Sequence, residues 1–332
     1  MLGANRRRIL PLAAVLTGAL ASAGAVLALG DPDGRGTASA ARVTGACGVS
    51  GPATVAAVQD LVARRIYADE LHGRETLEDA ARVRSFQPLL GALERGEPAA
   101  VASAVHALVY MPHWHIVRLR VMRGSKLLAD VGGPHVTAPV TGVLRAHGRP
   151  LARYVMSVQD DLGYQKLVTR FIGAPIDIYQ HGAFVMGTLT PAPAMPADGS
   201  RVQVAGRSWL VQNVAIRAFP SGSLQASLFI PASTGAASSC ATLRLEAWGA
   251  VARHLAARLS PLSSARYQAL ADLVRSITGG RLLVRSGSQR LVGGGPARLP
   301  STGTVSYAGR RWPVYSWQPV AGQRVYLLAP PG

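Results

Sequence analysis

An internal repeat constrains the fold of this chain more than any other feature of its sequence. Six residues between Val202 and Val211, including Ala-Gly-Arg and a tryptophan, recur 103 positions later between Val305 and Val314, and Val204 corresponds to Tyr307. Gly222 and Leu228 then match two residues 100 positions later, Gly322 and Leu328. A repeat of this length is too long for a solenoid and indicates duplicated α+β units.

The repeat extends to the segments around it. A shorter predicted hairpin precedes each copy, at residues 176–187 and 281–292, and a similar one at 118–130 precedes a turn centred on His147-Gly148. Apolar residues at helical spacing predict helices after Ser50-Gly51-Pro52. Further helices are predicted around residues 86–93, 101–109, 160–171, 245–255 and 267–277.

These elements predict an α+β fold of tandem antiparallel sheets. An N-terminal helical segment precedes the first sheet, and a second helical pair precedes the last. The expected divisions are a leader at 1–41, a helical segment at 50–111, a first sheet unit at 112–175, a second at 176–232, and a helical pair with a third unit at 238–332.

The N-terminus carries an export pattern. Arg6, Arg7 and Arg8 precede an uncharged run over residues 9–30, and two Ala-x-Ala sites follow at 21–23 and 38–40. The run is also long enough to cross a bilayer, so a cleaved signal peptide and an uncleaved anchor both fit. Either alternative places the remaining chain outside the cytoplasm, secreted or anchored. No second apolar span follows, so no transmitter domain is expected within this chain.

The chain contains two cysteines, Cys47 and Cys240. Each precedes a predicted helix that opens a helical segment ahead of a sheet unit. Because an oxidising compartment favours disulfides, we expect these two cysteines to pair.

The charge distribution is uneven. The chain has a net charge of +18, and from His181 onward it contains 15 arginines and three acidic residues. Outside a membrane, such a surface can hold anionic envelope polymers or lipid headgroups. A solvated surface that reflects arginine-rich codon usage explains the charge equally simply. Specific nucleic-acid binding is not expected at this location.

Several segments share the order of one known domain type: the run at 89–97, the strand at 116–121 with the turn Gly124-Ser125, the turn region at 148–151 and the strand at 154–158. Together they resemble the extracytoplasmic PAS-like sensor domains of the Cache (PDC) family. The resemblance covers about residues 50–231, with a further PAS-like unit from Cys240. It implies binding of a small extracellular ligand in the concavity of a sheet, with the signal passed to a membrane-bound partner.

The first unit contains the predicted ligand site. Arg118 and Arg120 share one face of a strand, and Arg153 and Ser157 share one face of another, whereas Tyr154 points to the opposite side. An arginine-bearing face turned inward can bind a small anionic ligand through bidentate hydrogen bonds. Solvent exposure is the simpler alternative for the arginines. Asp160 and Asp161 open the next helix, where Asp161 can contact ligand or both acids can cap the helix.

Motifs for catalysis are lacking in the sequence. There is no G-x-S-x-G elbow, and Gly293-Gly294-Gly295 is not followed by the Lys-Ser/Thr of a phosphate-binding loop. His113 and His115 with His135 or Asp130 can form a zinc site, but surface or pocket histidines are the simpler interpretation. We therefore expect no enzyme activity, no cofactor and no metal. The alternative to a ligand-binding protein is a structural or adhesive envelope protein.

Overall fold

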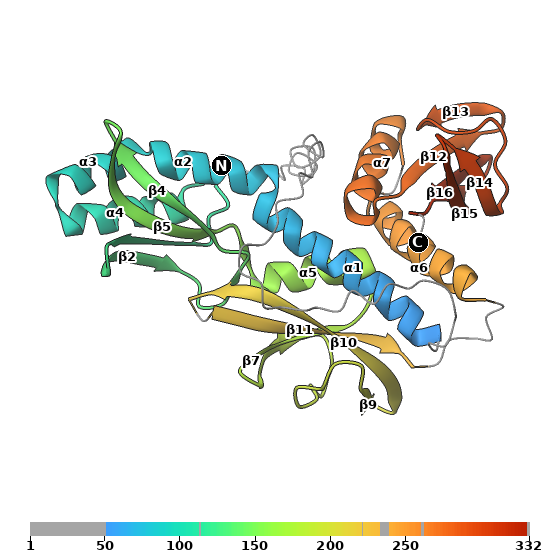
Figure 1. The fold of residues 1–332 in the computed structure, drawn as a ribbon, viewed down its shortest axis with the longest axis horizontal. Coiled ribbons are helices and arrows are strands. Elements are labelled where there is room, and N and C mark those ends of the chain that lie inside the picture. Colours follow the sequence, from blue (N-terminus) through green and yellow to red (C-terminus); the bar gives the residue numbers. More distant parts are fainter. Residues whose placement is uncertain (1–50, 113, 221, 233–238, 260–261, 331–332) are drawn as a thin grey trace, which may run out of the picture.

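The computed structural model describes residues 51–330, except 113, 221, 233–238 and 260–261. Its helices and strands form three antiparallel sheets with helices packed against each of them (Figure 1). Residues 1–50, which include the predicted leader and Cys47, lie outside the described residues. Among the described residues, no helix combines the length and apolar character needed to cross a membrane.

The first unit contains sheet A, with strand order β2-β1-β5-β4. Three helices cover one of its faces and share a buried apolar cluster with it. Pro88 lies at the start of α3, and Gly96 ends that helix in the left-handed conformation, which are the ordinary helix start and stop signals. The elements are α2 (Arg74–Ser85), α3 (Gln87–Arg95), α4 (Pro98–Tyr110), β1 (Arg118–Arg123), β2 (Lys126–Gly132), β4 (Val140–Ala146) and β5 (Arg149–Ser157).

The second unit contains sheet B, which packs against the long helix α1 and against α5 (Figure 1). Two short strands from the first half of the chain, β3 and β6, join this sheet beside the end of β10. The elements are α1 (Gly51–His72), β3 (Val136–Thr137), β6 (Gln159–Asp160), α5 (Asp161–Ile172), β7 (Ile176–Gln180), β8 (Ala183–Gly187), β9 (Arg201–Val204), β10 (Arg207–Phe219) and β11 (Gly222–Pro231). Residues 159–172 therefore pack with the second sheet, although they fall within the range expected for the first unit.

The third unit contains sheet C, with strand order β13-β12-β16-β15-β14. Two helices lie on one face of the sheet, and serine side chains cap the N-termini of both. The elements are α6 (Cys240–Arg258), α7 (Ser264–Thr278), β12 (Arg281–Ser286), β13 (Gln289–Val292), β14 (Thr302–Tyr307), β15 (Arg310–Val320) and β16 (Gln323–Leu328).

All three sheets follow one plan. Each begins with a hairpin, and the last strand of the unit returns to pair with the first strand of that hairpin. The repeat in the sequence occupies equivalent positions, because Val202 pairs with Trp209 and Val305 pairs with Trp312. The turns of both copies have positive φ at Ala and Gly, as a two-residue hairpin of type I′ requires. The predicted α+β fold of tandem sheets is confirmed.

The apolar cores divide the molecule differently from the sheets. The first unit has its own core, whereas α1, α5, α6 and α7 join sheets B and C in one continuous core. Trp248 of α6 and Tyr164 of α5 are among the largest side chains buried there. The third unit therefore packs as a continuation of the second.

Candidate functional site

Arg118 and Arg120 lie side by side on β1, as predicted, and both bind Asp130 on β2. The Asp130 carboxylate accepts hydrogen bonds from Arg118 Nε at 2.8 Å and from Arg120 Nη2 at 2.6 Å. Arg118 also donates to the main-chain oxygen of Gly133. The side chain of Arg118 is only 13% exposed, so simple solvent exposure does not describe it.

The aromatic ring of Phe219, at the end of β10, covers both guanidinium groups. The distances from the guanidinium carbon to the ring centre are 5.1 Å for Arg118 and 4.7 Å for Arg120. Burial alone would raise the pKa of Asp130, but the two guanidinium groups outweigh it and hold that pKa below its usual value. The two arginines therefore already have Asp130 as their anionic partner. Their contacts with Phe219 join the first unit to the second.

The other predicted residues are spread over two faces of sheet A. Arg153 is exposed on the same face as Arg120, whereas Tyr154 is buried on the helix-covered face, where its hydroxyl lies 3.2 Å from Arg84 Nη1. The Ser157 hydroxyl is buried, donates to the main-chain oxygen of Thr137 and accepts the main-chain N–H of Gln159 at 3.1 Å. The predicted opposition of Tyr154 to Arg153 and Ser157 is correct. The anionic-ligand site itself stays a prediction.

Asp160 caps helix α5, as the simpler interpretation of this acidic pair suggested. Its carboxylate accepts the main-chain N–H of Gly163 at 2.6 Å. Asp161 accepts the main-chain N–H of Leu162 at 2.9 Å, and burial raises the pKa of its carboxyl group. Both carboxylates are thus engaged at the start of the helix.

An open cavity of about 550 Å³ lies beside these residues, between the end of α4 and the end of β2. Tyr110, Trp114 and His115 form its aromatic wall, and Asp160 contributes the one carboxylate. His115 contacts Glu75 through Nδ1, and Asp160 caps α5. The side chains of His115 and Asp160 therefore already contact other parts of the fold.

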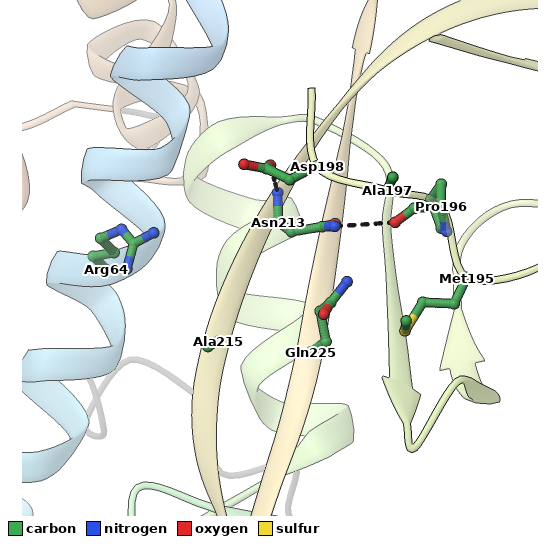
Figure 2. A pocket seen from close by; sticks show the side chains of 8 residues that line it. All are labelled: Arg64, Met195, Pro196, Ala197, Asp198, Asn213, Ala215 and Gln225. Atoms are coloured by element: carbon green, nitrogen blue, oxygen red, sulfur yellow. Dashed lines mark hydrogen bonds between the residues drawn. The ribbon is translucent and has the colours of Figure 1, made fainter. Parts of the chain in front are cut away.

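A second open cavity of about 550 Å³ lies in the second unit and has a different chemistry (Figure 2). It opens beside β10, between α1 and the segment that connects β8 to β9. Its lining combines a guanidinium, a carboxylate, two side-chain amides and apolar groups. The lining residues are Arg64, Met195, Pro196, Ala197, Asp198, Asn213, Ala215 and Gln225.

Hydrogen bonds hold the Met195–Asp198 wall of this cavity in place. The Asp198 carboxylate accepts the main-chain N–H of Asn213 at 2.7 Å, and the Asn213 side-chain amide donates to the oxygen of Pro196 at 3.0 Å (Figure 2). A carboxylate has room for further donors beyond this one contact. Asp198 can therefore keep its place and still accept from a ligand.

Arg64 lies on the α1 side of the same cavity. Its Nε donates to both carboxylate oxygens of Asp60, each at 2.9 Å. These hydrogen bonds are the main cause of the raised pKa of Arg64, and the charge of Asp198 adds to it. Within the described chain, the two Nη groups of Arg64 make no hydrogen bond. The cavity thus presents one guanidinium fork and one carboxylate.

A buried polar row continues from Asn213 across the sheet. The Ser227 hydroxyl on β11 donates to the Asn213 side-chain oxygen at 2.7 Å, and Asp177 on β7 pairs with Ser227. Asp177 Oδ1 accepts the main-chain N–H groups of Thr188 and Leu189, which fixes the start of the β8–β9 segment. Its Oδ2 is buried and has no hydrogen-bond partner among the described residues, and burial raises the pKa of this carboxyl group.

Sequence patterns did not predict this cavity. A usable signal was present, because Asp198 is one of only three acidic residues after position 180 and lies in a segment with three prolines. Arg64 gave no such signal, since an arginine on a helix face is ordinarily solvated. Among the described residues, no group of three His, Cys, Asp or Glu side chains is placed to hold a metal ion.

Comparison with known proteins found likeness only at the level of structure. No protein-family model matches the sequence, and no curated protein matches it. The periplasmic domain of Vibrio cholerae LuxQ matches at 9% identity and a TM-score of 0.32, over 55% of this chain and 98% of that one. The ligand-binding domain of the Pseudomonas fluorescens chemoreceptor CtaA, in its complex with L-alanine, matches at 14% identity and a TM-score of 0.30, over 57% of this chain and 100% of that one.

One of these matches is a periplasmic domain and the other is the ligand-binding domain of a chemoreceptor. Their TM-scores are too low to support any inference about ligand or activity. The three sheets share one plan, in which the last strand of the unit returns to pair with the first strand of the hairpin. This plan agrees with the predicted α+β fold of tandem sheets, whereas the sensor family and the ligand stay predictions.

Proposed function

We propose that this chain is an extracytoplasmic, sensor-type protein that binds a small zwitterionic ligand in the cavity of its second unit. The observation that supports the proposal is the placement of Arg64 and Asp198 on the lining of one open cavity. The export pattern at residues 1–30 supports the location. A membrane-bound partner would receive the signal.

The chemistry of the lining selects the ligand class. The open Nη groups of Arg64 suit a carboxylate, which a guanidinium binds through two parallel hydrogen bonds. The Asp198 carboxylate suits an ammonium group, and the amides of Asn213 and Gln225 suit further polar atoms. Met195 and Ala215 offer apolar contact for a short side chain. A free amino acid combines these features.

A thermal-shift screen of the purified protein against amino acids, organic acids and purines tests the proposal. A ligand that binds only the folded state raises the melting temperature. We expect at least one amino acid to do so, and we expect Asp198→Asn to abolish the shift because it removes the charge while keeping the shape. Asp272→Asn, on α7 outside the cavity, is the matched control and should keep the shift.

The same screen separates this site from the anionic-ligand site predicted in the first unit. Arg153→Ala removes an exposed member of that site without disturbing the Asp130 ion pairs. We expect this variant to bind the ligand normally. A shift caused by an organic acid, lost in Arg153→Ala and kept in Asp198→Asn, would instead place the site in the first unit. The absence of any shift would contradict the function.

A further inference from the structure

Three arginines stand side by side on neighbouring strands of sheet C. Arg285 on β12 pairs directly with Arg290 on β13 and with Arg324 on β16. Directly paired residues of antiparallel strands have Cβ atoms only about 5 Å apart, and like charges in such positions destabilise a sheet. This row lies far along the chain from the cavity of the proposed function and is independent of it.

The row points away from the helices. Val284, which precedes Arg285, belongs to the core that sheet C shares with α6 and α7, whereas Leu283 belongs to a separate cluster on the other face. Because side chains alternate along a strand, Arg285 lies on the outer face with Leu283. Arg290 and Arg324 are exposed there, and Arg285 is half-buried.

The triple-glycine segment orients two of these guanidinium groups. Arg290 Nη2 donates to the oxygen of Gly295 at 2.9 Å, and Arg285 Nη2 donates to the oxygen of Pro296 at 2.8 Å. A Cβ at Gly295 would lie 2.1 Å from Leu283 Cδ2, so a larger residue there would displace Leu283 or move the segment away from the sheet. The two guanidinium groups are therefore held by consecutive carbonyls.

Among the described residues, no carboxylate forms an ion pair with this row. Within the described part of residues 239–330, the acidic residues are Glu246 and Asp272, and both lie on the helices that cover the other face. Arg285, Arg290 and Arg324 form no ion pair among the described residues, and Arg285 Nε is buried without an acceptor. This differs from Arg118 and Arg120, which share Asp130.

We propose that Arg285, Arg290 and Arg324 bind a phosphate group on the outer face of sheet C. Guanidinium groups bind phosphate through charge-assisted, bidentate hydrogen bonds. A terminal phosphate has three oxygens and up to two negative charges, which match three donors on adjacent strands. A carboxylate has two oxygens and one charge, which a single arginine satisfies. Binding would remove the like-charge repulsion within the row.

Titration of the full chain with pyrophosphate, followed by calorimetry, tests this site. We expect the double variant Arg290→Gln/Arg324→Gln to weaken binding at least about tenfold, since each loses a charged hydrogen bond. The control Arg310→Gln/Arg311→Gln removes the same charge from exposed positions of β15 in the same unit. We expect it to change the affinity less than about twofold, because only general attraction is lost.

Two results would overturn the proposal. One is the absence of pyrophosphate binding by the wild-type chain at low salt. The other is an equal loss of affinity in the two double variants, which would show attraction to the basic unit as a whole. The proposed function is tested independently of this site, because its test uses Asp198→Asn in the second unit.

Vesicles distinguish a lipid phosphate from a soluble one. Binding to phosphatidylglycerol vesicles but not to phosphatidylcholine vesicles, if lost in Arg290→Gln/Arg324→Gln and displaced by pyrophosphate, assigns the site to lipid headgroups. Pyrophosphate binding without vesicle binding assigns it to soluble phosphate compounds. Both results support a phosphate site and differ only in the source of the phosphate.

Discussion

Gly142 shows how closely the first unit is packed at the scale of single residues. It lies on β4, and a Cβ built there would come within 2.4 Å of the buried ring of Tyr154. We expect Gly142→Ala to lower the free energy of unfolding by about 1–3 kcal/mol, because overpacking forces the ring or the strand to move. Chemical denaturation measures this. Gly133→Ala, where a Cβ meets no atom within 4 Å, is the control and should have less effect.

Glu70, near the end of α1, links stability to pH. Burial, with a smaller effect of Asp69, raises its pKa to about 7. The folded chain therefore binds this proton between about pH 4.5 and pH 7, where the unfolded chain has released it. Stability should fall as pH rises through this range, by at most about 1.4 kcal/mol per pH unit.

The variant Glu70→Gln cannot release this proton and should lose that pH dependence. Unfolding curves between pH 5 and pH 8 compare it with wild type, and exposed Glu246→Gln on α6 serves as the control. Identical pH profiles for Glu70→Gln and wild type would show that Glu70 does not cause the effect.

At the scale of elements, two short strands and helix α1 together cover the edge of β10 that faces away from β11. Strand β9 pairs with residues 207–210 of β10, and β3 pairs with residues 218 and 219. Residues 211–217 of β10 therefore pair with neither of these strands. Tyr67 of α1 reaches this edge, and its hydroxyl accepts the main-chain N–H of Arg217 at 3.0 Å. The helix thus covers part of the edge that strands leave open.

Tyr67→Phe removes this contact while keeping the aromatic ring. We expect it to lower the free energy of unfolding by about 1 kcal/mol, the net value of one hydrogen bond, and to speed hydrogen exchange at Arg217. Tyr110→Phe is the control, because Tyr110 is 63% exposed. Unchanged exchange at Arg217 would show that water replaces the hydroxyl without cost.

The elements also show what sequence periodicity can and cannot predict. It predicted α1, α3, α4, α5, α6 and α7 and the three short hairpins, because each carries its apolar residues at a regular period. It missed α2, whose buried side includes the polar residues Thr76 and Asp79. It also missed β3 and β6, since two residues each are too few to show a period.

The functional site was harder to predict than the fold for a physical reason. Arg118 and Arg120 were placed correctly on one face, but the pairing of β1 with β2, which brings Asp130 to them, is a tertiary property. The same holds for Arg64 and Asp198, which come from a helix and from an irregular segment far apart in the sequence. The residue pattern of one segment does not indicate which residues of a distant segment lie beside it in the folded chain.

At the scale of the whole molecule, α1 and α6 lie side by side with their N-terminal ends at the same end of the molecule (Figure 1). Cys240 is the first residue of α6, and Cys47 precedes α1 by a few residues. This arrangement favours the predicted disulfide, although Cys47 lies outside the described residues. The bridge would join the start of the long helix to the third unit.

We expect thiol titration of the non-reduced protein to find no free cysteine. Reduction, or the variant Cys47→Ser, should lower the free energy of unfolding by up to roughly 5 kcal/mol, because the bridge closes a loop of about 190 residues. Two reactive thiols in the non-reduced protein would contradict the pairing.

The most direct test of the account is a crystal structure of the protein with the amino acid that gives the largest thermal shift. We expect ligand density in the cavity of the second unit, with the carboxylate at the Nη groups of Arg64 and the ammonium at Asp198. Density beside Arg153, or in the cavity lined by Tyr110 and Trp114, would contradict it.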